Sequence, residues 1–181
     1  MTTIFTIGHS TRAINEFIEI LRTQNITQLV DIRTIPKSRH NPQYGHNLLS
    51  KSLEMNEIEY VYLKELGGLR PAVEHSINEA WHNKSFRNYA DYMQSDDFKQ
   101  GLARLIDLAH KATTAIMCAE AVPWRCHRSL VSDALLTHDI SVKEIISISS
   151  IRPHQMTSFA VTNKTDIYYP KSALEENDIA V

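Results

Sequence analysis

The sequence predicts an α/β protein with a three-layer, Rossmann-like fold and a mostly parallel sheet of about five strands. Short apolar runs of strand character alternate with segments whose apolar residues recur at helical spacing. This alternation favours a parallel sheet, because parallel strands need long crossovers that helices usually supply. The chain has 181 residues, and we expect residues 1–170 to form one domain, followed by a loose tail over residues 171–181.

Five apolar runs enriched in Ile, Val, Thr and Tyr are the expected strands. The first, TIFTI, is stopped by Gly8. In chain order the five runs cover residues 3–7, 28–32, 58–63, 113–118 and 142–148. A further run at residues 165–170 is a candidate edge strand.

The segments between these runs carry the helical signals. Ile14, Phe17 and Leu21 share one helical face, and Ser95 is a candidate N-cap because two aspartates follow it. In chain order, helices are expected near residues 14–21, 48–53, 85–94, 96–110 and 126–138.

Two segments are expected to be irregular. Residues 33–46 contain two prolines and a glycine, which predict a long loop, and Gly67-Gly68 followed by a proline predicts a turn. The polar residues 72–84 favour no regular element.

Composition narrows the classes of protein that the chain can belong to. The content of 43% hydrophobic and 22% charged residues argues against a disordered chain. The net charge of −2 provides no overall basic field for nucleic acid or an anionic membrane. The chain has two cysteines, too few for a disulfide framework, and shows neither a signal peptide nor an apolar run of membrane-spanning length. We therefore expect a cytoplasmic protein without membrane contact.

A parallel sheet gives the search for a site a definite place, because ligands bind beyond the carboxyl ends of its strands. Polar residues follow the first, second and fourth expected strands, and they should gather at this edge. They are His9, Ser10, Asp31, Arg33, Cys118 and Glu120.

The segment CAEAVPWRCHR at residues 118–128 carries the strongest chemical signal, because it holds both cysteines. Cys126 would open a helix beside His127 and Arg128, a setting that lowers the pKa of a thiol. Since adjacent helical residues do not face each other, a second histidine such as His9 would be needed as the base. Cys118 could instead be a small buried apolar residue, and a disulfide or a zinc site using these residues is a weaker alternative.

The loop after the second strand concentrates basic residues. Arg33 and Arg39 could bind phosphate or carboxylate oxygens, and Tyr44 could stack on a base. The alternative is a solvated loop in which Asp31 pairs with an arginine. The phosphate-binding patterns GxGxxG and GxxxxGK[ST] are both absent, so standard nucleotide enzymes are disfavoured.

The residues GHS at 8–10, DIRTIPKSR at 31–39, LGG at 66–68, MCAE at 117–120 and CHR at 126–128 together resemble the DUF488 family of small bacterial and archaeal proteins. The likeness runs from about residue 4 to residue 170 and ends with His154 and Tyr169-Pro170. The resemblance implies an α/β fold and an active site formed by the DIRTIP and CAE…CHR segments. It implies no reaction.

Three functional hypotheses follow. The first is an enzyme acting on an anionic, phosphate-bearing substrate, for example a nucleotide or nucleic acid whose glycosidic bond it cleaves. Glu120, with Asp31 or His9, would be catalytic, and Cys126 would attack or line the pocket. The groups expected to bind the substrate are Arg33, Arg39, Ser10, Cys118, His127, Arg128 and Tyr44.

The second hypothesis is a cysteine-dependent redox or sulfur-transfer enzyme that uses Cys126 with Cys118. The third is a module that binds a phosphorylated ligand without catalysis. None of the three hypotheses requires a cofactor or a metal ion.

Overall fold

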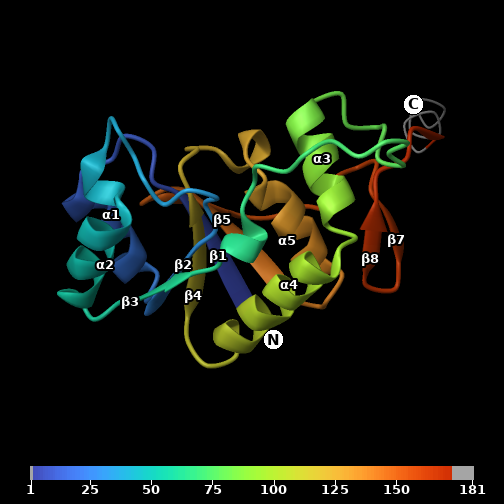
Figure 1. The fold of residues 1–181 in the computed structure, drawn as a ribbon. Coiled ribbons are helices and arrows are strands. Elements are labelled where there is room, and N and C mark those ends of the chain that lie inside the picture. Colours follow the sequence, from blue (N-terminus) through green and yellow to red (C-terminus); the bar gives the residue numbers. More distant parts are fainter. Residues whose placement is uncertain (1, 173–181) are drawn as a thin grey trace.

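The computed structural model describes residues 2–172 and contains a central sheet in the order β3-β2-β4-β1-β5-β6 (Figure 1). The strands β1 to β5 are parallel, and β6 is antiparallel to β5. Their bounds are β1 (Thr3–Gly8), β2 (Gln28–Asp31), β3 (Glu59–Tyr62), β4 (Thr114–Cys118), β5 (Ser141–Ser147) and β6 (Ser150–Pro153). The expected mostly parallel α/β sheet is therefore confirmed.

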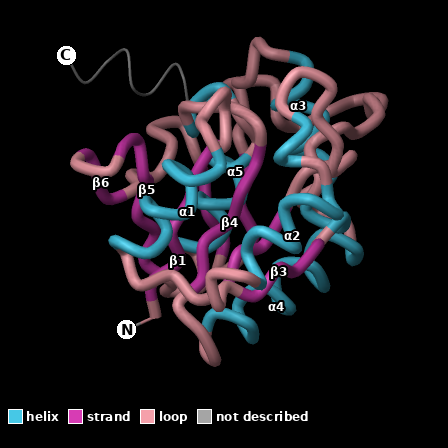
Figure 2. The backbone as a smooth tube through the Cα atoms, turned by 90° about the vertical axis from the view of Figure 1, so that its left-hand side faces the viewer, coloured by secondary structure: helices cyan, strands magenta, loops and turns pink. Residues whose placement is uncertain are grey.

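Helices cover both faces of the sheet, which gives three layers (Figure 1), and Figure 2 is the view from the side of α1 and α2. On one face α1 and α2 pack against alternate strand residues such as Ala115 and Met117. On the other face α3, α4 and α5 pack against Ile116 and its neighbours. The helix bounds are α1 (Ile14–Thr23), α2 (His46–Glu54), α3 (Lys84–Tyr92), α4 (Asp96–Ala109) and α5 (Arg128–Leu136).

Local signals placed most of these elements correctly. Ser95 caps α4, since its side chain accepts a hydrogen bond from the backbone N–H of Phe98. The strands β2 and β4 are buried at every residue, as expected for parallel strands with helices on both faces. Within residues 2–172, no helix combines the length and the apolar character needed to cross a membrane.

The helix expected from residue 126 begins two residues later, at Arg128. Pro123–Arg125 form a 3₁₀ turn, and Cys126 is extended with φ −135° and ψ 148°. Cys126 is therefore an extended residue before α5 and not its first residue. An extended backbone places its side chain differently from a helical one, so Cys126 can contact other groups than expected.

The C-terminal strand is also placed differently from the expectation. The expected edge strand at residues 165–170 contains β8 (Asp166–Tyr168), but β8 pairs with β7 (Val161–Asn163) in a separate two-stranded sheet. The sheet edge beside β5 is already occupied by β6, a strand of low apolar content that the sequence pattern did not reveal. Most of the expected tail, residues 173–181, lies outside the described residues.

Candidate functional site

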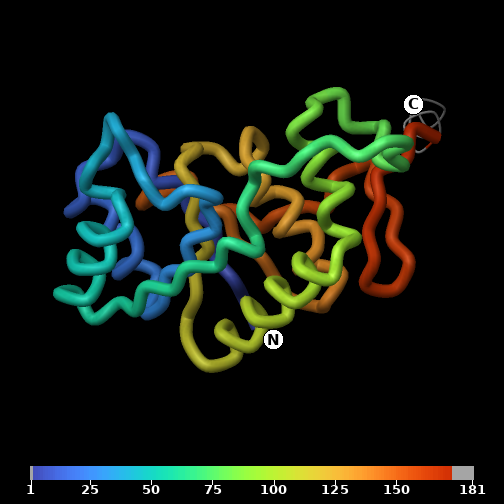
Figure 3. The backbone as a smooth tube through the Cα atoms, in the orientation of Figure 1, coloured from blue at the N-terminus to red at the C-terminus, as the bar shows by residue number. Residues whose placement is uncertain are grey.

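The ends of β1, β2 and β4 meet at one edge of the sheet, as the parallel arrangement predicts. Gly8 lies opposite Cys118 in the register, and the backbone N–H of His9 donates to the Cys118 carbonyl at 3.0 Å. The N–H of Ile32 donates to Met117 at 3.0 Å. The long connection between β3 and α3, green in Figure 3, passes by the same edge, because Gly68 lies against His127.

A cavity of about 460 Å³ opens at this edge. Five of the residues singled out from the sequence line it: Arg33, Cys118, Glu120, Cys126 and His127. The other lining residues are Thr34, Ile35, Lys37, Gly68, Leu69, Ser85, Phe86, Ala119 and Arg125. The cavity is therefore built from the loops after β2, β3 and β4 together with the first turn of α3.

Two glycines allow the close approach of the loops. A Cβ atom on Gly8 would collide with the backbone of Glu120, so the loop after β4 can cross the end of β1 only at a glycine. A Cβ atom on Gly68 would lie 2.6 Å from Nδ1 of His127. The glycine pair, expected to make a turn, thus also allows the imidazole to sit against the turn.

Cys126 is the thiol with the most direct acid–base partner. Its Sγ lies 3.5 Å from Nδ1 of His127 and 3.5 Å from the backbone nitrogen of Arg128. The expectation that a second histidine such as His9 would be needed is wrong. Because Cys126 is extended and precedes the helix, the neighbouring His127 reaches it.

The tautomer of His127 follows from its other contact. Nε2 lies 3.0 Å from the carbonyl oxygen of Ile32, which can only accept, so Nε2 carries the proton. Nδ1 is then unprotonated, and its lone pair faces Sγ of Cys126. Burial lowers the pKa of His127, so the ring is neutral near neutral pH and can accept the thiol proton.

Arg128 is fully buried between the two thiols. Its Nε donates to Sγ of Cys118 at 3.0 Å, and Nη2 donates to the carbonyl of Glu120 at 2.7 Å. Nη1 donates to the hydroxyl of Thr6 at 3.3 Å. Within residues 2–172, no carboxylate forms an ion pair with this guanidinium. A buried charge without a counter-ion is costly, so the nearby thiols are its natural partners.

The two thiols differ in their readiness to ionise. Burial raises the pKa of Cys118 well above its usual value, and its hydrogen bond to Cys126 adds to that effect. Burial opposes ionisation of Cys126 as well, but the hydrogen bond from Cys118 and the charge of Arg128 outweigh it and lower the pKa of Cys126 to about 7. Near neutral pH the thiolate form of Cys126 therefore carries a negative charge that balances the positive charge of Arg128.

His9, Asp31, Arg33 and Tyr44 form a second buried cluster beside the cavity. Arg33 donates to both oxygens of Asp31, with Nη2 at 2.6 Å from Oδ2, and Tyr60 donates to the same carboxylate at 2.7 Å. Asp31 and Arg33 thus neutralise each other, as the alternative for this loop expected, but the pair is buried and not solvated.

His9 is held within this cluster. Its ring stacks on Tyr44 at 4.1 Å between centroids, and its Nδ1 donates to the Ser10 carbonyl at 2.8 Å. Burial lowers the pKa of His9 to about 4, so the ring stays neutral. His9, Ser10, Asp31 and Tyr44 do not line the cavity.

The remaining predicted residues are more exposed. Glu120 is exposed on the cavity lining, while Arg39 is exposed and does not line the cavity. Among residues 2–172, no three His, Cys, Asp or Glu side chains are grouped in a way that could hold a metal ion. The cysteines and His127 therefore do not form part of such a group in the described chain.

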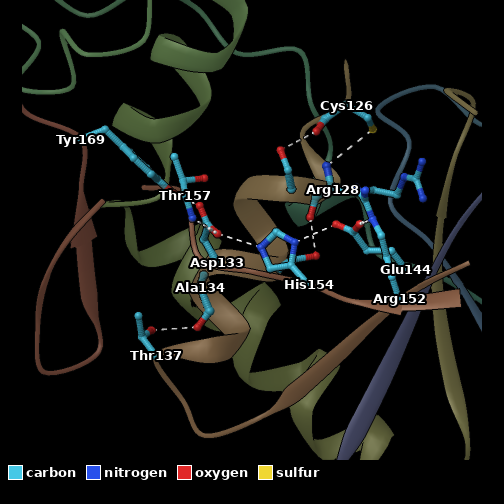
Figure 4. A network of polar contacts seen from close by, with 12 residues as sticks. Cys126, Arg128, Asp133, Ala134, Thr137, Glu144, Arg152, His154, Thr157 and Tyr169 are labelled. Carbon is cyan, nitrogen blue, oxygen red and sulfur yellow. Dashed lines mark hydrogen bonds and ion pairs between the residues drawn. The ribbon is translucent and has the colours of Figure 1, made fainter. Parts of the chain in front are cut away.

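A buried network around His154, which was not predicted from the sequence, lies behind the site (Figure 4). Nε2 of His154 lies 2.8 Å from Asp133 of α5, and Nδ1 lies 2.7 Å from Glu144 of β5. Tyr169 and the backbone of Thr157 also donate to Asp133. The network ties the helix that carries Arg128 to the C-terminal strands. An aspartate on the buried face of an apolar helix was the available signal.

One of the three comparisons with known proteins gives a match. The model of the family described as a domain of unknown function, DUF488, matches residues 13–135. No curated protein matches the chain. No solved structure matches it either.

Proposed function

The chain belongs to the DUF488 family, and we propose that it is a cysteine-dependent enzyme of redox or sulfur-transfer chemistry whose nucleophile is Cys126. One observation carries the proposal: Sγ of Cys126 lies beside an unprotonated imidazole nitrogen and the backbone N–H of a buried arginine, at a cavity. Reactive cysteines need such an electropositive setting with access to a substrate.

The proposed first step is attack by the Cys126 thiolate on an electrophilic sulfur of the substrate. A bond forms between Sγ and that sulfur, the substrate's sulfur–sulfur bond breaks, and the leaving thiolate takes the electron pair. Nδ1 of His127 accepts the proton from any Cys126 that enters as the thiol. The leaving thiolate can later take that proton, so His127 returns to its neutral state.

Cys118 suits a second step of the redox form of this reaction. Both thiols line the same cavity, and Arg128 contacts each of them, Cys126 through its backbone N–H and Cys118 through its side chain. Cys118 would then attack Sγ of Cys126 and form a disulfide, and its proton would pass to the second substrate thiolate as that thiolate leaves. The substrate disulfide is then reduced and the cysteine pair is oxidised, and an external dithiol would return the pair to its reduced form.

The carboxylate-dependent hydrolase receives less support from the geometry. Glycosidic cleavage requires two carboxyl groups that flank the bond. Glu120 lines the cavity, but Asp31 is held by Arg33 and Tyr60 outside it. Of the three arginines expected to bind the anion, Arg128 is directed at the thiols and Arg39 lies away from the cavity.

The proposal is tested by the pH dependence of alkylation of each cysteine with iodoacetamide, followed by peptide mass spectrometry. We expect Cys126 to react with a midpoint near its pKa of about 7, and Cys118 to react much more slowly. The variant Cys126→Ser should abolish exchange with a model disulfide. Cleavage of a modified nucleoside or DNA that is lost in Glu120→Gln but kept in Cys126→Ser would instead support the hydrolase. Slow alkylation of both thiols would overturn the proposal.

The variant His127→Gln separates the two contacts of the imidazole. A glutamine amide can keep the donor to the Ile32 carbonyl but lacks the basic nitrogen that could take the proton of Cys126. We expect slower alkylation below the pKa of Cys126, where the thiol must lose a proton.

A binding module without catalysis predicts no exchange activity in any variant and unchanged ligand binding in Cys126→Ser.

A further inference from the structure

The charged side chains on the cavity lining are mostly cationic, although the whole chain has a net charge of −2. Lys37 and Arg125 are both exposed on this lining. Glu120 is the one acidic residue that lines the cavity within residues 2–172. The local excess of positive charge therefore comes from a few placed residues and not from composition.

The two exposed cations are free to meet a ligand. Arg33 is neutralised by Asp31, and Arg128 is balanced by the thiolate. Lys37 and Arg125, by contrast, form no ion pair with an acid anywhere in the part of the chain that the structure describes.

A thiolate repels an approaching anion. An anionic substrate therefore needs nearby cations that are not already paired with the thiolate. Lys37 and Arg125 meet that need, since both line the cavity that contains Cys126. Cations of this kind raise the local concentration of an anion and speed its encounter with the site.

We propose that the substrate of Cys126 is an anionic sulfur electrophile, a disulfide or thiosulfonate whose body carries a carboxylate, sulfonate or phosphate, and that Lys37 and Arg125 select it. This inference rests on the proposed function. The step is the exchange described above: a bond forms between Sγ and the substrate sulfur while the leaving group departs with the electron pair.

Two reagents of the same chemical type and opposite charge test the proposal. They are the sulfonatoethyl and the trimethylammonioethyl methanethiosulfonates, which both transfer their thioalkyl group to a thiolate and release methanesulfinate. The measured quantity is the ratio of the two rate constants at Cys126, anionic over cationic, divided by the same ratio for a free small thiol. At low salt we expect this normalised ratio to exceed about 10 and to fall as the ionic strength rises.

Matched variants assign the selectivity to residues. Lys37→Gln and Arg125→Gln should each lower the ratio severalfold, and the double variant should lower it further. Glu120→Gln should raise the ratio, because it removes the acid. The controls Lys111→Gln and Arg104→Gln remove an exposed cation elsewhere, and the ratio should not change.

The outcomes separate this inference from the proposed function. If Cys126 reacts rapidly with both reagents but shows the ratio of a free thiol, the anionic substrate class is wrong and the reactive thiol stands. An unchanged ratio in the Lys37→Gln, Arg125→Gln double variant also overturns the inference. If neither reagent labels Cys126, both proposals fall.

Discussion

Nε of Arg128 lies 3.0 Å from Sγ of Cys118, and this buried guanidinium has no carboxylate partner within residues 2–172. Arginines in protein interiors are usually paired with an acid. Here the partner is a pair of thiols, one of which ionises readily. This relationship gives the first prediction.

Replacing Arg128 by Met should make Cys126 an ordinary thiol. Without the guanidinium, the pKa of Cys126 should rise from about 7 toward the usual value of about 8.5. Alkylation at neutral pH should then slow by about tenfold, since each unit of pKa changes the thiolate population by that factor. The conservative variant Arg128→Lys should retain part of the effect. An unchanged pH profile in Arg128→Met would contradict the assignment.

Asp31 and Arg33 should behave as a structural ion pair. Asp31→Asn leaves a buried guanidinium without its counter-ion, so the free energy of unfolding should fall by about 3 kcal/mol. Adding Arg33→Met should recover part of this loss, because the uncompensated charge is removed. Urea denaturation of both single variants and the double variant measures the coupling. If the loss of unfolding free energy in the double variant equals the sum of the two single losses, the two side chains are not coupled.

Gly68→Ala should disturb the site through His127. The new methyl group would lie 2.6 Å from Nδ1, so the ring must move away from Cys126 or the turn must shift. We expect slower alkylation of Cys126 and a loss of about 1–3 kcal/mol of stability, typical of overpacking. Gly45→Ala is the control, because its methyl group would meet one carbonyl oxygen at 3.2 Å and Gly45 does not line the cavity. Equal effects in both variants would dismiss the role of Gly68.

The network around His154 should give stability a defined pH window. Burial alone would lower the pKa of His154, but its hydrogen bonds to Asp133 and Glu144 raise it from 6.5 to about 9. This contribution is complete below 6.5 and is lost as pH rises through about 9. Burial likewise opposes the ionisation of Glu144, but His154 and Arg152 lower its pKa below 4.5, so its contribution is present above that value and is lost as pH falls.

The measurement is the free energy of unfolding as a function of pH. His154→Gln should remove the alkaline decline and cost about 3 kcal/mol near neutral pH, since the buried Asp133 loses its cation and Glu144 keeps Arg152 alone. His110→Asn, at an exposed site after α4, serves as the control. A wild-type curve that stays flat through the alkaline range would refute the charged state of His154.

Much of the fold could be predicted because its signals are local. Strand runs such as TIFTI, the apolar face of α1 and the Ser95 cap depend on residues within a few positions of one another. The strand β6 escaped prediction because its single inward apolar residue, Ile151, leaves no pattern. The start of α5 was misplaced because the 3₁₀ turn and the extended Cys126 depend on the neighbouring loop.

The sequence by itself determined that polar residues lie at or just after the ends of β1, β2 and β4 and that both thiols flank one loop, since these are matters of order along the chain. Only the tertiary structure decided which of those residues face the cavity. Asp31 and His9 turn into a buried cluster, while His127 reaches Cys126 and Arg128 reaches both thiols. The physical reason is that a buried charge must find a counter-charge across the fold, and sequence spacing does not specify that partner.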